Sequence, residues 1–231
     1  MKLKKIKEIK GRITLKSGLH IGAGDTEMKI GGTDNPVIKH PHTQEPFIPG
    51  SSLKGKVRSL LEMKSGLMAK TGGKPLTVSD INNCNGEEKK IGEKILKLFG
   101  TSGAHDDERE ELGPTRVSFA DAFLNTDWKK MAEENQWLLT EVKAENSINR
   151  IKGTAENPRF IERVPSDTVF DFCIALKEME EDKNLEDFLI EGLKLLQMDA
   201  LGGSGSRGYG KIAFKFDDAD TQKKFDESTP L

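Results

Sequence analysis

The order of the periodic segments is the feature that most constrains how this chain folds. Apolar residues recur at every second position in some segments, as in strands, and at every third or fourth position in others, as on one face of a helix. The order is strand, helix, two strands, helix, strand, at residues 5–16, 51–61, 116–124, 168–176, 185–196 and 212–216. This is the βαββαβ order of a ferredoxin-like (RRM-like) core. We therefore expect an α+β fold in one domain over residues 1–231.

Three long segments interrupt this core, and we expect them to be insertions. They cover residues 17–50, 66–113 and 141–165. Within the second insertion, residues 69–90 have the composition of a loop, and a short helix over 91–99 is expected to end at Gly100. Stretches of this length without clear structure are uncommon in a compact domain unless they carry function. The chain ends in an acidic tail, residues 217–231.

Composition and charge exclude several classes of protein. Only 35% of the residues are hydrophobic, and no apolar run approaches the roughly 18 residues that cross a membrane. The 36 Lys and Arg are balanced by 38 Asp and Glu, so the chain is not uniformly basic, although residues 1–74 are. The two cysteines form no disulfide scaffold, and no apolar segment follows the basic N-terminus. We expect a cytoplasmic protein with no membrane partner.

The strongest local signal is a glycine-rich segment, residues 202–211, which we call the glycine loop. Glycine permits positive φ and a close approach of the backbone to a ligand. Main-chain N–H groups together with Arg207 and Lys211 suit a phosphate. The loop matches nucleotide-binding patterns only superficially, because it leads from a helix into a strand and Ile212 replaces the P-loop Ser or Thr. The alternative is a flexible connector, against which the bulky Tyr209 argues.

A second basic segment surrounds the expected start of the first helix. Ser51 or Ser52 is a suitable N-cap, and the free N–H groups of a helix N-terminus attract anions. Three cations follow at once: Lys54, Lys56 and Arg58. Basic residues are unfavourable in a first turn, so their presence is explained if a polyanion lies across them. The alternative is an ordinary capped helix with solvated lysines.

One carboxylate is singled out by its surroundings. Asp34 lies in a glycine-rich loop, residues 31–39, directly before an Asn-Pro turn. A carboxylate beside bound phosphates can hold a hydrated divalent metal ion. The alternative for Asp34 is ordinary turn chemistry.

Residues 141–165 carry alternating charges of both signs. Arg150, Arg159 and Arg163 are interleaved with glutamates, as in a solvated hairpin or in an arm that wedges against nucleic acid. The four histidines lack the spacing of metal ligands, and Cys84 has no partner cysteine nearby, so no structural zinc site is expected.

Taken together, these segments resemble the RAMP superfamily of CRISPR proteins, whose signature is similar to the glycine loop. Five further blocks look like the backbone (Cas7-like) subunit of the type III-A CRISPR Csm effector complex: residues 18–22, 34–39, 48–56, 98–100 and 157–165. The resemblance covers most of the chain and is weakest over residues 66–93 and after 217.

The resemblance implies several copies in a filament along a CRISPR guide RNA, with other subunits of the Csm effector complex. Residues 141–165 would form a thumb hairpin that kinks the duplex of guide and complementary target RNA. The cutting residue would be Asp34, which would hold Mg²⁺ or another divalent cation such as Mn²⁺. The RNA contacts carried over would be His20, Ser51, Ser52, Lys54, Lys56, Arg58, Arg150, Arg159, Arg163, Gly202, Gly203, Gly205, Ser206, Arg207, Gly208, Gly210 and Lys211.

The implied activity is that of an RNA-guided, metal-dependent endoribonuclease on single-stranded target RNA. RNA carries its own nucleophile, the 2′-OH beside the scissile phosphate, so an enzyme mainly needs to splay one nucleotide into line. DNA lacks this hydroxyl and would be spared. Two alternatives stay open. One is a non-catalytic subunit that only holds the guide RNA, and the other is a metal-independent endoribonuclease that cuts CRISPR repeat RNA with His20 as its base.

Overall fold

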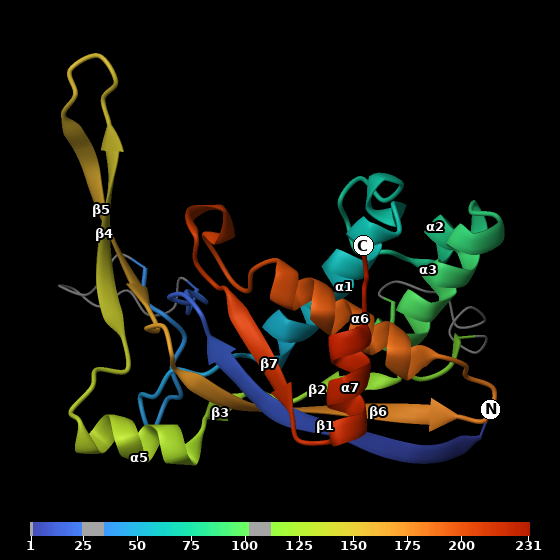
Figure 1. Ribbon diagram of the computed structural model, residues 1–231. Coiled ribbons are helices and arrows are strands. Elements are labelled where there is room, and N and C mark those ends of the chain that lie inside the picture. Colours follow the sequence, from blue (N-terminus) through green and yellow to red (C-terminus); the bar gives the residue numbers. More distant parts are fainter. Residues whose placement is uncertain (1, 25–34, 102–111) are drawn as a thin grey trace.

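The computed structural model describes residues 2–24, 35–101 and 112–231, which form a mixed α/β fold with antiparallel sheets (Figure 1). This confirms the expected α+β class. The main sheet contains β1 (Leu3–Leu15), β2 (Val117–Phe119), β3 (Phe123–Leu124), β6 (Val169–Met179) and β7 (Ile212–Phe216). A separate hairpin pairs β4 (Glu141–Ile148) with β5 (Ala155–Arg163). The helices are α1 (Gly50–Lys64), α2 (Val78–Asn82), α3 (Gly86–Phe99), α5 (Thr126–Glu134), α6 (Leu185–Met198) and α7 (Ala219–Glu227).

The main sheet has the strand order β2–β6–β1–β7, and β3 pairs with β6. Strand β1 lies between two partners, so that Ile13 is opposite Phe170 on one side and Phe214 on the other. The expected alternation is present, because Ile9, Ile13 and Leu15 are buried while Lys10 and Arg12 between them are exposed. The sheet thus gives one apolar face to the core.

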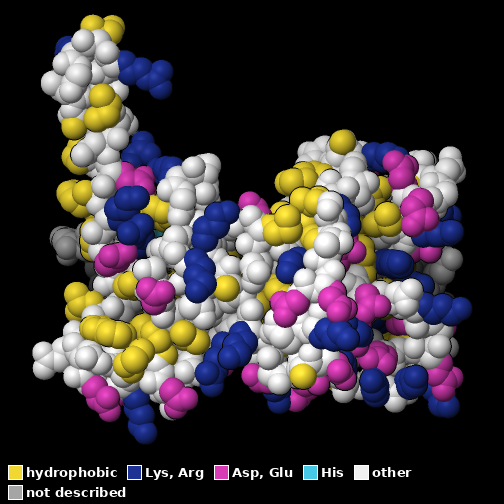
Figure 2. All heavy atoms as spheres, in the orientation of Figure 1, with side chains coloured by type: hydrophobic (Ala, Val, Ile, Leu, Met, Phe, Trp, Pro, Cys, Tyr) yellow, Lys and Arg dark blue, Asp and Glu magenta, His cyan; other side chains and the backbone are white. Residues whose placement is uncertain are grey.

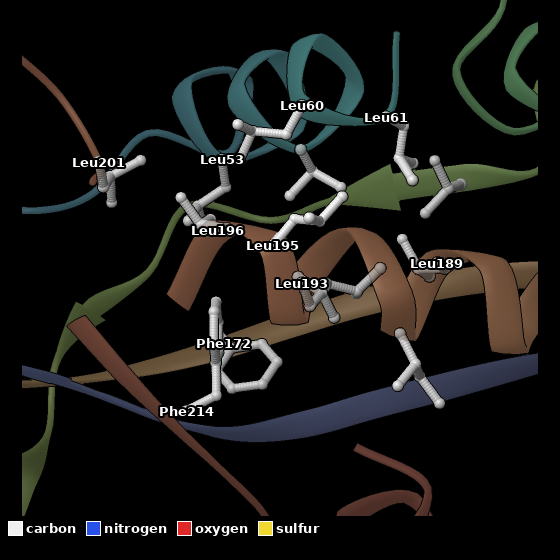
Figure 3. Packing of buried hydrophobic residues seen from close by; sticks show 14 of the residues in the cluster. Leu53, Leu60, Leu61, Phe172, Leu189, Leu193, Leu195, Leu196, Leu201 and Phe214 are labelled. Carbon is white, nitrogen blue, oxygen red and sulfur yellow. The ribbon is translucent and has the colours of Figure 1, made fainter. Parts of the chain in front are cut away.

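Helices α1 and α6 cover this face (Figures 1 and 3). Each turns an apolar stripe inward, as its sequence period predicts. Figure 3 shows the leucines of both helices meeting above the aromatic rings of the sheet: Leu53, Leu60, Leu61, Leu189, Leu193, Leu196, Phe172 and Phe214. Burial of this size, at about 25 cal/mol per Å² of apolar surface, is the main force that holds the helices to the sheet.

The close pairing of β1 with β7 requires a glycine at position 11. It faces Phe172 in β6 and Phe216 in β7. A Cβ atom at this position would lie 2.2 Å from the carbonyl oxygen of Lys215, which is far inside van der Waals contact. Glycine is therefore required here for β7 to pair closely with β1.

The expectation that residues 69–90 form a loop is wrong. Helix α2 lies within this segment, and α3 begins at Gly86 rather than at Ile91. Thr77 and Asp80 form a capping box that starts α2. The first turn of α3 is entirely polar, so it has no apolar period to reveal it. The helix ends at Gly100, as expected, where φ is +81°.

Two other helices also lack a sequence period. Asn125 accepts a hydrogen bond of 3.1 Å from the Trp128 amide and so caps α5. Asp218 accepts one of 2.8 Å from the Thr221 amide and caps α7, which buries Phe225 against the core. The acidic tail thus contains a packed helix. The expected strand over residues 116–124 is divided into β2 and β3.

The β4–β5 hairpin projects from the body of the protein (Figures 1 and 2). We call residues 141–165 the thumb hairpin. Its distal half is exposed, and Ile151 at the tip is 98% exposed. Its base is different, because Ile161, Glu162 and Val164 are buried. The thumb hairpin is therefore a free arm fixed at one end. Over the described ranges of the chain, no helix has the length and apolar content to cross a membrane.

Candidate nucleic-acid interface

Helix α1 begins with main-chain N–H groups at one edge of the candidate site. Pro49 is its N-cap residue, so the expectation that Ser51 or Ser52 caps it is wrong. The Gly50 amide instead donates a hydrogen bond of 2.8 Å to Oδ1 of Asp121, and a Cβ at Gly50 would lie 2.2 Å from the Phe119 carbonyl oxygen. Ser51 is exposed and Ser52 half-buried, which leaves both hydroxyls in the first turn.

The three cations in the first half of α1 differ in their surroundings. Lys54 is half-buried, and burial together with the charge of Arg58 lowers the pKa of its ammonium group. Lys56 forms an ion pair of 2.7 Å with Asp199, just after α6. Because a half-buried ammonium is costly without a counter-charge, Lys54 is the cation of α1 best suited to an anionic ligand.

Arg58 is not brought to this surface. Its guanidinium donates to Oε1 of Glu62 at 2.7 Å and to the carbonyl oxygens of Gly100 and Leu76 at 3.0 and 2.6 Å. The last two bonds join the insertion over residues 66–113, which contains α2 and α3, to α1. They also compensate for the burial of the guanidinium charge, so in this structure Arg58 stabilises the fold.

The glycine loop is held open by its backbone conformation. Gly202, Gly208 and Gly210 have φ values of +75°, +86° and +72°, and Ser204 is also left-handed. The amide of Gly203 donates to the His20 carbonyl oxygen at 2.9 Å, and that of Gly210 donates to the Gly18 carbonyl oxygen at 2.9 Å. These main-chain hydrogen bonds tie the loop to residues 18–20, which argues against the alternative of a flexible connector.

Lys211 closes this loop and contacts the end of α6. Its ammonium group lies 2.9 Å from the carbonyl oxygen of Asp199 and 3.4 Å from that of Met198. A cation at a helix C-terminus is favourable because the unpaired carbonyl groups there carry partial negative charge. Ser206 and Arg207 remain on the exposed side of the loop.

The glycine loop contacts the base of the thumb hairpin. Tyr209 is fully buried, and its hydroxyl donates a hydrogen bond of 2.7 Å to Oε1 of Glu145. Arg207 donates to the other oxygen of the same carboxylate at 2.6 Å. The cations of Lys143 and Arg163 lie 4.7 and 5.0 Å from the centre of the Tyr209 ring, within cation–π range. Burial and the Glu145 carboxylate raise the pKa of Tyr209.

The segment after Asp34 meets the thumb hairpin at Glu162. Nδ1 of His20 lies 2.7 Å from the main-chain carbonyl oxygen of Glu162, so Nδ1 is the donor in this contact. The Glu162 side chain accepts hydrogen bonds from the Val37 amide at 2.9 Å and from Nζ of Lys39 at 2.6 Å.

Asp34 itself lies outside the described residues, as do residues 31–33 of its loop, whereas residues 35–39 are described. Arg150 and Arg159 are exposed on the thumb hairpin, and Arg163 lies at its base against Gly18. Among described residues, no group of three or more His, Cys, Asp or Glu side chains comes together as a metal cage. Mg²⁺ usually keeps several waters and is shared between one or two carboxylates and substrate phosphates, so it does not require such a cage.

The structure adds residues that the sequence did not single out. Glu145, Glu162 and Lys39 join the thumb hairpin to the two loops beside it. In the sequence, these are three ordinary members of a chain in which 32% of the residues are charged. Tyr209 had a signal, because it is the single tyrosine of the chain and stands inside the glycine loop.

This fold and this site belong to a known class. The sequence profile of the RAMP superfamily matches residues 12–213. The chain therefore belongs to the RAMP superfamily, and its relatives place it, within that superfamily, in the Csm3 family.

The relatives share most of their length with this chain. The "CRISPR system Cms endoribonuclease Csm3" of Streptococcus thermophilus is 45% identical over 212 residues, which cover 88% of this chain and 84% of the relative. The protein of the same name from Methanothermobacter thermautotrophicus is 39% identical over 231 residues, which cover 93% of this chain and 86% of that one.

Two solved structures are also similar. A crystal structure of a Csm3–Csm4 subcomplex of the type III-A CRISPR-Cas interference complex contains a chain that matches with a TM-score of 0.54 and 33% identity, over 93% of this chain and 78% of that chain. A cryo-EM structure of the type III-B Cmr-β complex bound to cognate target RNA contains one with a TM-score of 0.57 and 16% identity, over 91% of this chain and 59% of that chain. The second shows likeness of fold alone.

Proposed function

We propose that this chain is the guide-RNA-binding backbone subunit of a type III-A CRISPR effector complex, and that it cuts the target RNA as an endoribonuclease. The relatives at 45% and 39% identity carry the name endoribonuclease, and the Csm3–Csm4 neighbour is part of an interference complex. Its partners are guide RNA, complementary target RNA, further copies of itself and the other subunits of the complex. A cytoplasmic location, expected from the two cysteines, is part of the same proposal.

The single observation that carries this proposal is the meeting of three segments at one place. Residues 18–20, the glycine loop and the base of the thumb hairpin are joined there by hydrogen bonds. Lys54 adds a half-buried ammonium at the start of α1, and Lys56 ties α1 to Asp199 beside the loop. Cations beside an exposed, glycine-rich stretch of backbone suit the ribose-phosphate backbone of a single strand.

We further propose that the core is ferredoxin-like with insertions. The strand order β2–β6–β1–β7, with α1 and α6 on one face, supports this, since the split βαβ arrangement requires the first and third strands to be neighbours. The insertions are then the segment before α1, the α2–α3 region and the thumb hairpin.

The proposed chemistry needs little from the protein. When the nucleotide is splayed out of its stack, its 2′-OH attacks the adjacent phosphorus, the P–O5′ bond breaks, and the products are a 2′,3′-cyclic phosphate and a 5′-OH. The projecting thumb hairpin is suited to separate neighbouring bases. Asp34 is the proposed catalytic carboxylate and the proposed ligand of Mg²⁺ or Mn²⁺. Such an ion would neutralise the developing phosphate charge. His20, fixed through Nδ1, would present Nε2 to the RNA.

The test uses the whole complex, purified through a tagged copy of this chain and carrying its own guide RNA. Matched and mismatched target RNA, and the matched DNA, are incubated with Mg²⁺ or with a chelator. We expect the matched RNA alone to be cut, and only with the metal. Asp34→Ala should abolish cutting while guide and target binding stay near the wild-type level.

Other outcomes separate the alternatives. Binding of matched RNA without cutting by the wild-type complex would indicate a guide-holding subunit that is not catalytic. Cutting of free repeat RNA by the isolated chain in chelator would favour the repeat-processing alternative with His20 as the base. Wild-type cutting by Asp34→Ala would remove Asp34 from the catalytic role.

A further inference from the structure

Glu162, at the base of the thumb hairpin, contacts the segment beside Asp34 through both its side chain and its main chain. Its carboxylate accepts from the Val37 amide at 2.9 Å and from Nζ of Lys39 at 2.6 Å. Its own amide donates to the carbonyl oxygen of Asn35 at 3.1 Å. Asn35 is the residue directly after Asp34, and it also forms a parallel bridge with Ile161.

The same residue holds the opposite side of the site. The Glu162 main-chain carbonyl accepts from Nδ1 of His20 at 2.7 Å, and His20 is bound through its own carbonyl to Gly203. One residue at the base of β5 therefore contacts both the segment that carries Asp34 and the segment that meets the glycine loop. A shift of the thumb hairpin at this point would move both segments.

The charge of Glu162 is what makes the contact specific. The side chain is only 8% exposed. Burial by itself would raise the pKa of this carboxyl, but hydrogen bonds from Lys39, Thr140 and the Val37 amide outweigh burial and lower it. The ionised carboxylate can accept from all three donors at once. A neutral amide in its place has one acceptor oxygen and turns its NH₂ group toward the remaining donors.

We propose that Glu162 is a positioning residue for RNA cleavage: it fixes residues 35–39, the segment that directly follows Asp34 in the sequence, to the base of the thumb hairpin. This inference rests on the proposed function. Glu162 touches neither RNA nor a metal ion in this scheme. It holds the segment that follows the proposed catalytic residue against the arm that is proposed to splay the nucleotide.

The test compares Glu162→Gln with a matched control in the assembled, guide-loaded complex. The control is Glu186→Gln, since Glu186 is also largely buried, also paired with lysines (Lys7 and Lys224), and lies in α6 far from the thumb hairpin. We expect Glu162→Gln to lower the single-turnover cutting rate about 10- to 100-fold, the size expected when a catalytic group is misplaced by about 1 Å. Affinities for guide and target should stay within about twofold, which separates positioning from uniform binding. Glu186→Gln should cut at the wild-type rate.

A second variant protects the test against misfolding. Lys39→Met removes the partner of Glu162 from a partly exposed position and should slow cutting less, by about 3- to 10-fold. In the double variant Glu162→Gln with Lys39→Met, the unpaired ammonium is gone, so the combined loss should be smaller than the product of the two single losses. A purely structural effect would lower the melting temperature in proportion and give no such coupling.

Hydrogen exchange separates failure of this inference from failure of the proposed function. The amides of Asn35 and of residues 37–39 should exchange at least about fivefold faster in Glu162→Gln than in the wild type, as for loss of one hydrogen bond. In Glu186→Gln they should exchange at the wild-type rate. Cutting by Glu162→Gln at the wild-type rate overturns the inference and leaves the proposed function standing. A wild-type complex that binds but does not cut overturns the proposed function, and the exchange rates then decide alone whether Glu162 holds the segment.

Discussion

The hydroxyl of Tyr209 donates a hydrogen bond of 2.7 Å to Oε1 of Glu145, joining the centre of the glycine loop to the thumb hairpin. Arg207 binds the second oxygen of the same carboxylate. Because Tyr209 is buried and its ring contacts the cations of Lys143 and Arg163, the loop and the hairpin form one continuous surface. RNA that binds to Arg207 has to share or displace Glu145.

Replacement of Lys54 by alanine should weaken RNA binding and flatten its salt dependence. Each phosphate contact that is lost lowers the slope of log K against log salt concentration by about 0.7 for a single strand. Lys223→Ala in α7 is the control, because this lysine is exposed and pairs only loosely with Glu227 at 3.9 Å. The measurement is affinity for guide RNA over a salt series. An unchanged slope for Lys54→Ala would show that Lys54 does not contact phosphate.

Two glycines of the same loop should respond differently to alanine. Gly208 and Gly210 both have positive φ, but a Cβ at Gly208 meets nothing within 4 Å, whereas at Gly210 it would lie 1.9 Å from the carbonyl oxygen of Leu201. Gly208→Ala should cost about 1–2 kcal/mol of unfolding free energy from backbone strain. Gly210→Ala should cost about 1–3 kcal/mol more from overpacking. Denaturant unfolding of both variants checks this, and equal losses would contradict it.

Removal of the Arg116 side chain should destabilise the protein strongly. Arg116 is 2% exposed, and it donates to Asp182 at 2.8 and 3.3 Å and to the carbonyl oxygens of Leu112 and Pro114. Arg116→Met leaves the buried Asp182 carboxylate unpaired, which typically costs about 3–5 kcal/mol. Lys223→Met at the exposed pair should cost less than about 0.5 kcal/mol. Similar melting temperatures for these two variants would refute the prediction.

The ion pairs of Glu186 predict a dependence of stability on pH. Burial tends to raise the pKa of this carboxyl, but hydrogen bonds from Lys7 and Lys224 outweigh burial and lower it. A carboxyl with a lowered folded-state pKa stabilises the fold above its unfolded pKa of about 4.5, and this stabilisation disappears as pH falls through the folded-state value.

Glu186→Gln should therefore lower the unfolding free energy by about 1–3 kcal/mol near neutral pH. The difference from wild type should shrink steadily below about pH 4.5. Urea unfolding at a series of pH values measures this. A difference that is constant from neutral to acidic pH would show that the charge of Glu186 contributes nothing.

The sequence predicts the elements whose apolar residues have a period. Strand β1, helix α6 and strand β7 were predicted within a few residues, because each buries one face. Helices α5 and α7 were not predicted, since their short polar sequences depend on the capping residues Asn125 and Asp218. Local capping is weak as a sequence signal, and here it acts together with burial of a few side chains such as Phe225.

The sequence likewise predicts the parts of the candidate site that have a local signal and misses those that depend on contacts between distant residues. The glycine loop could be found because glycine and cations are unusual in combination. The contacts of Arg58 within the fold could not be predicted, because they depend on the carbonyl oxygens of Leu76 and Gly100. These residues come later in the chain and reach α1 only through the fold of the insertion over residues 66–113. The contacts of Glu162 are equally non-local, because more than 120 residues separate it from Val37 and Lys39.

Gly11 has a consequence for any genetic search for loss of RNA binding. Strand β7 pairs so closely with β1 at Gly11 that no side chain fits there, and β7 begins directly after the glycine loop. A bulkier residue at position 11 would displace β7 and, with it, the glycine loop. Position 11 would therefore affect RNA binding although it lies within the sheet and outside the loop. Such a search would therefore return substitutions at position 11 together with substitutions of residues that contact RNA. Calorimetry would separate the two kinds, because only a substitution at position 11 would lower the unfolding temperature.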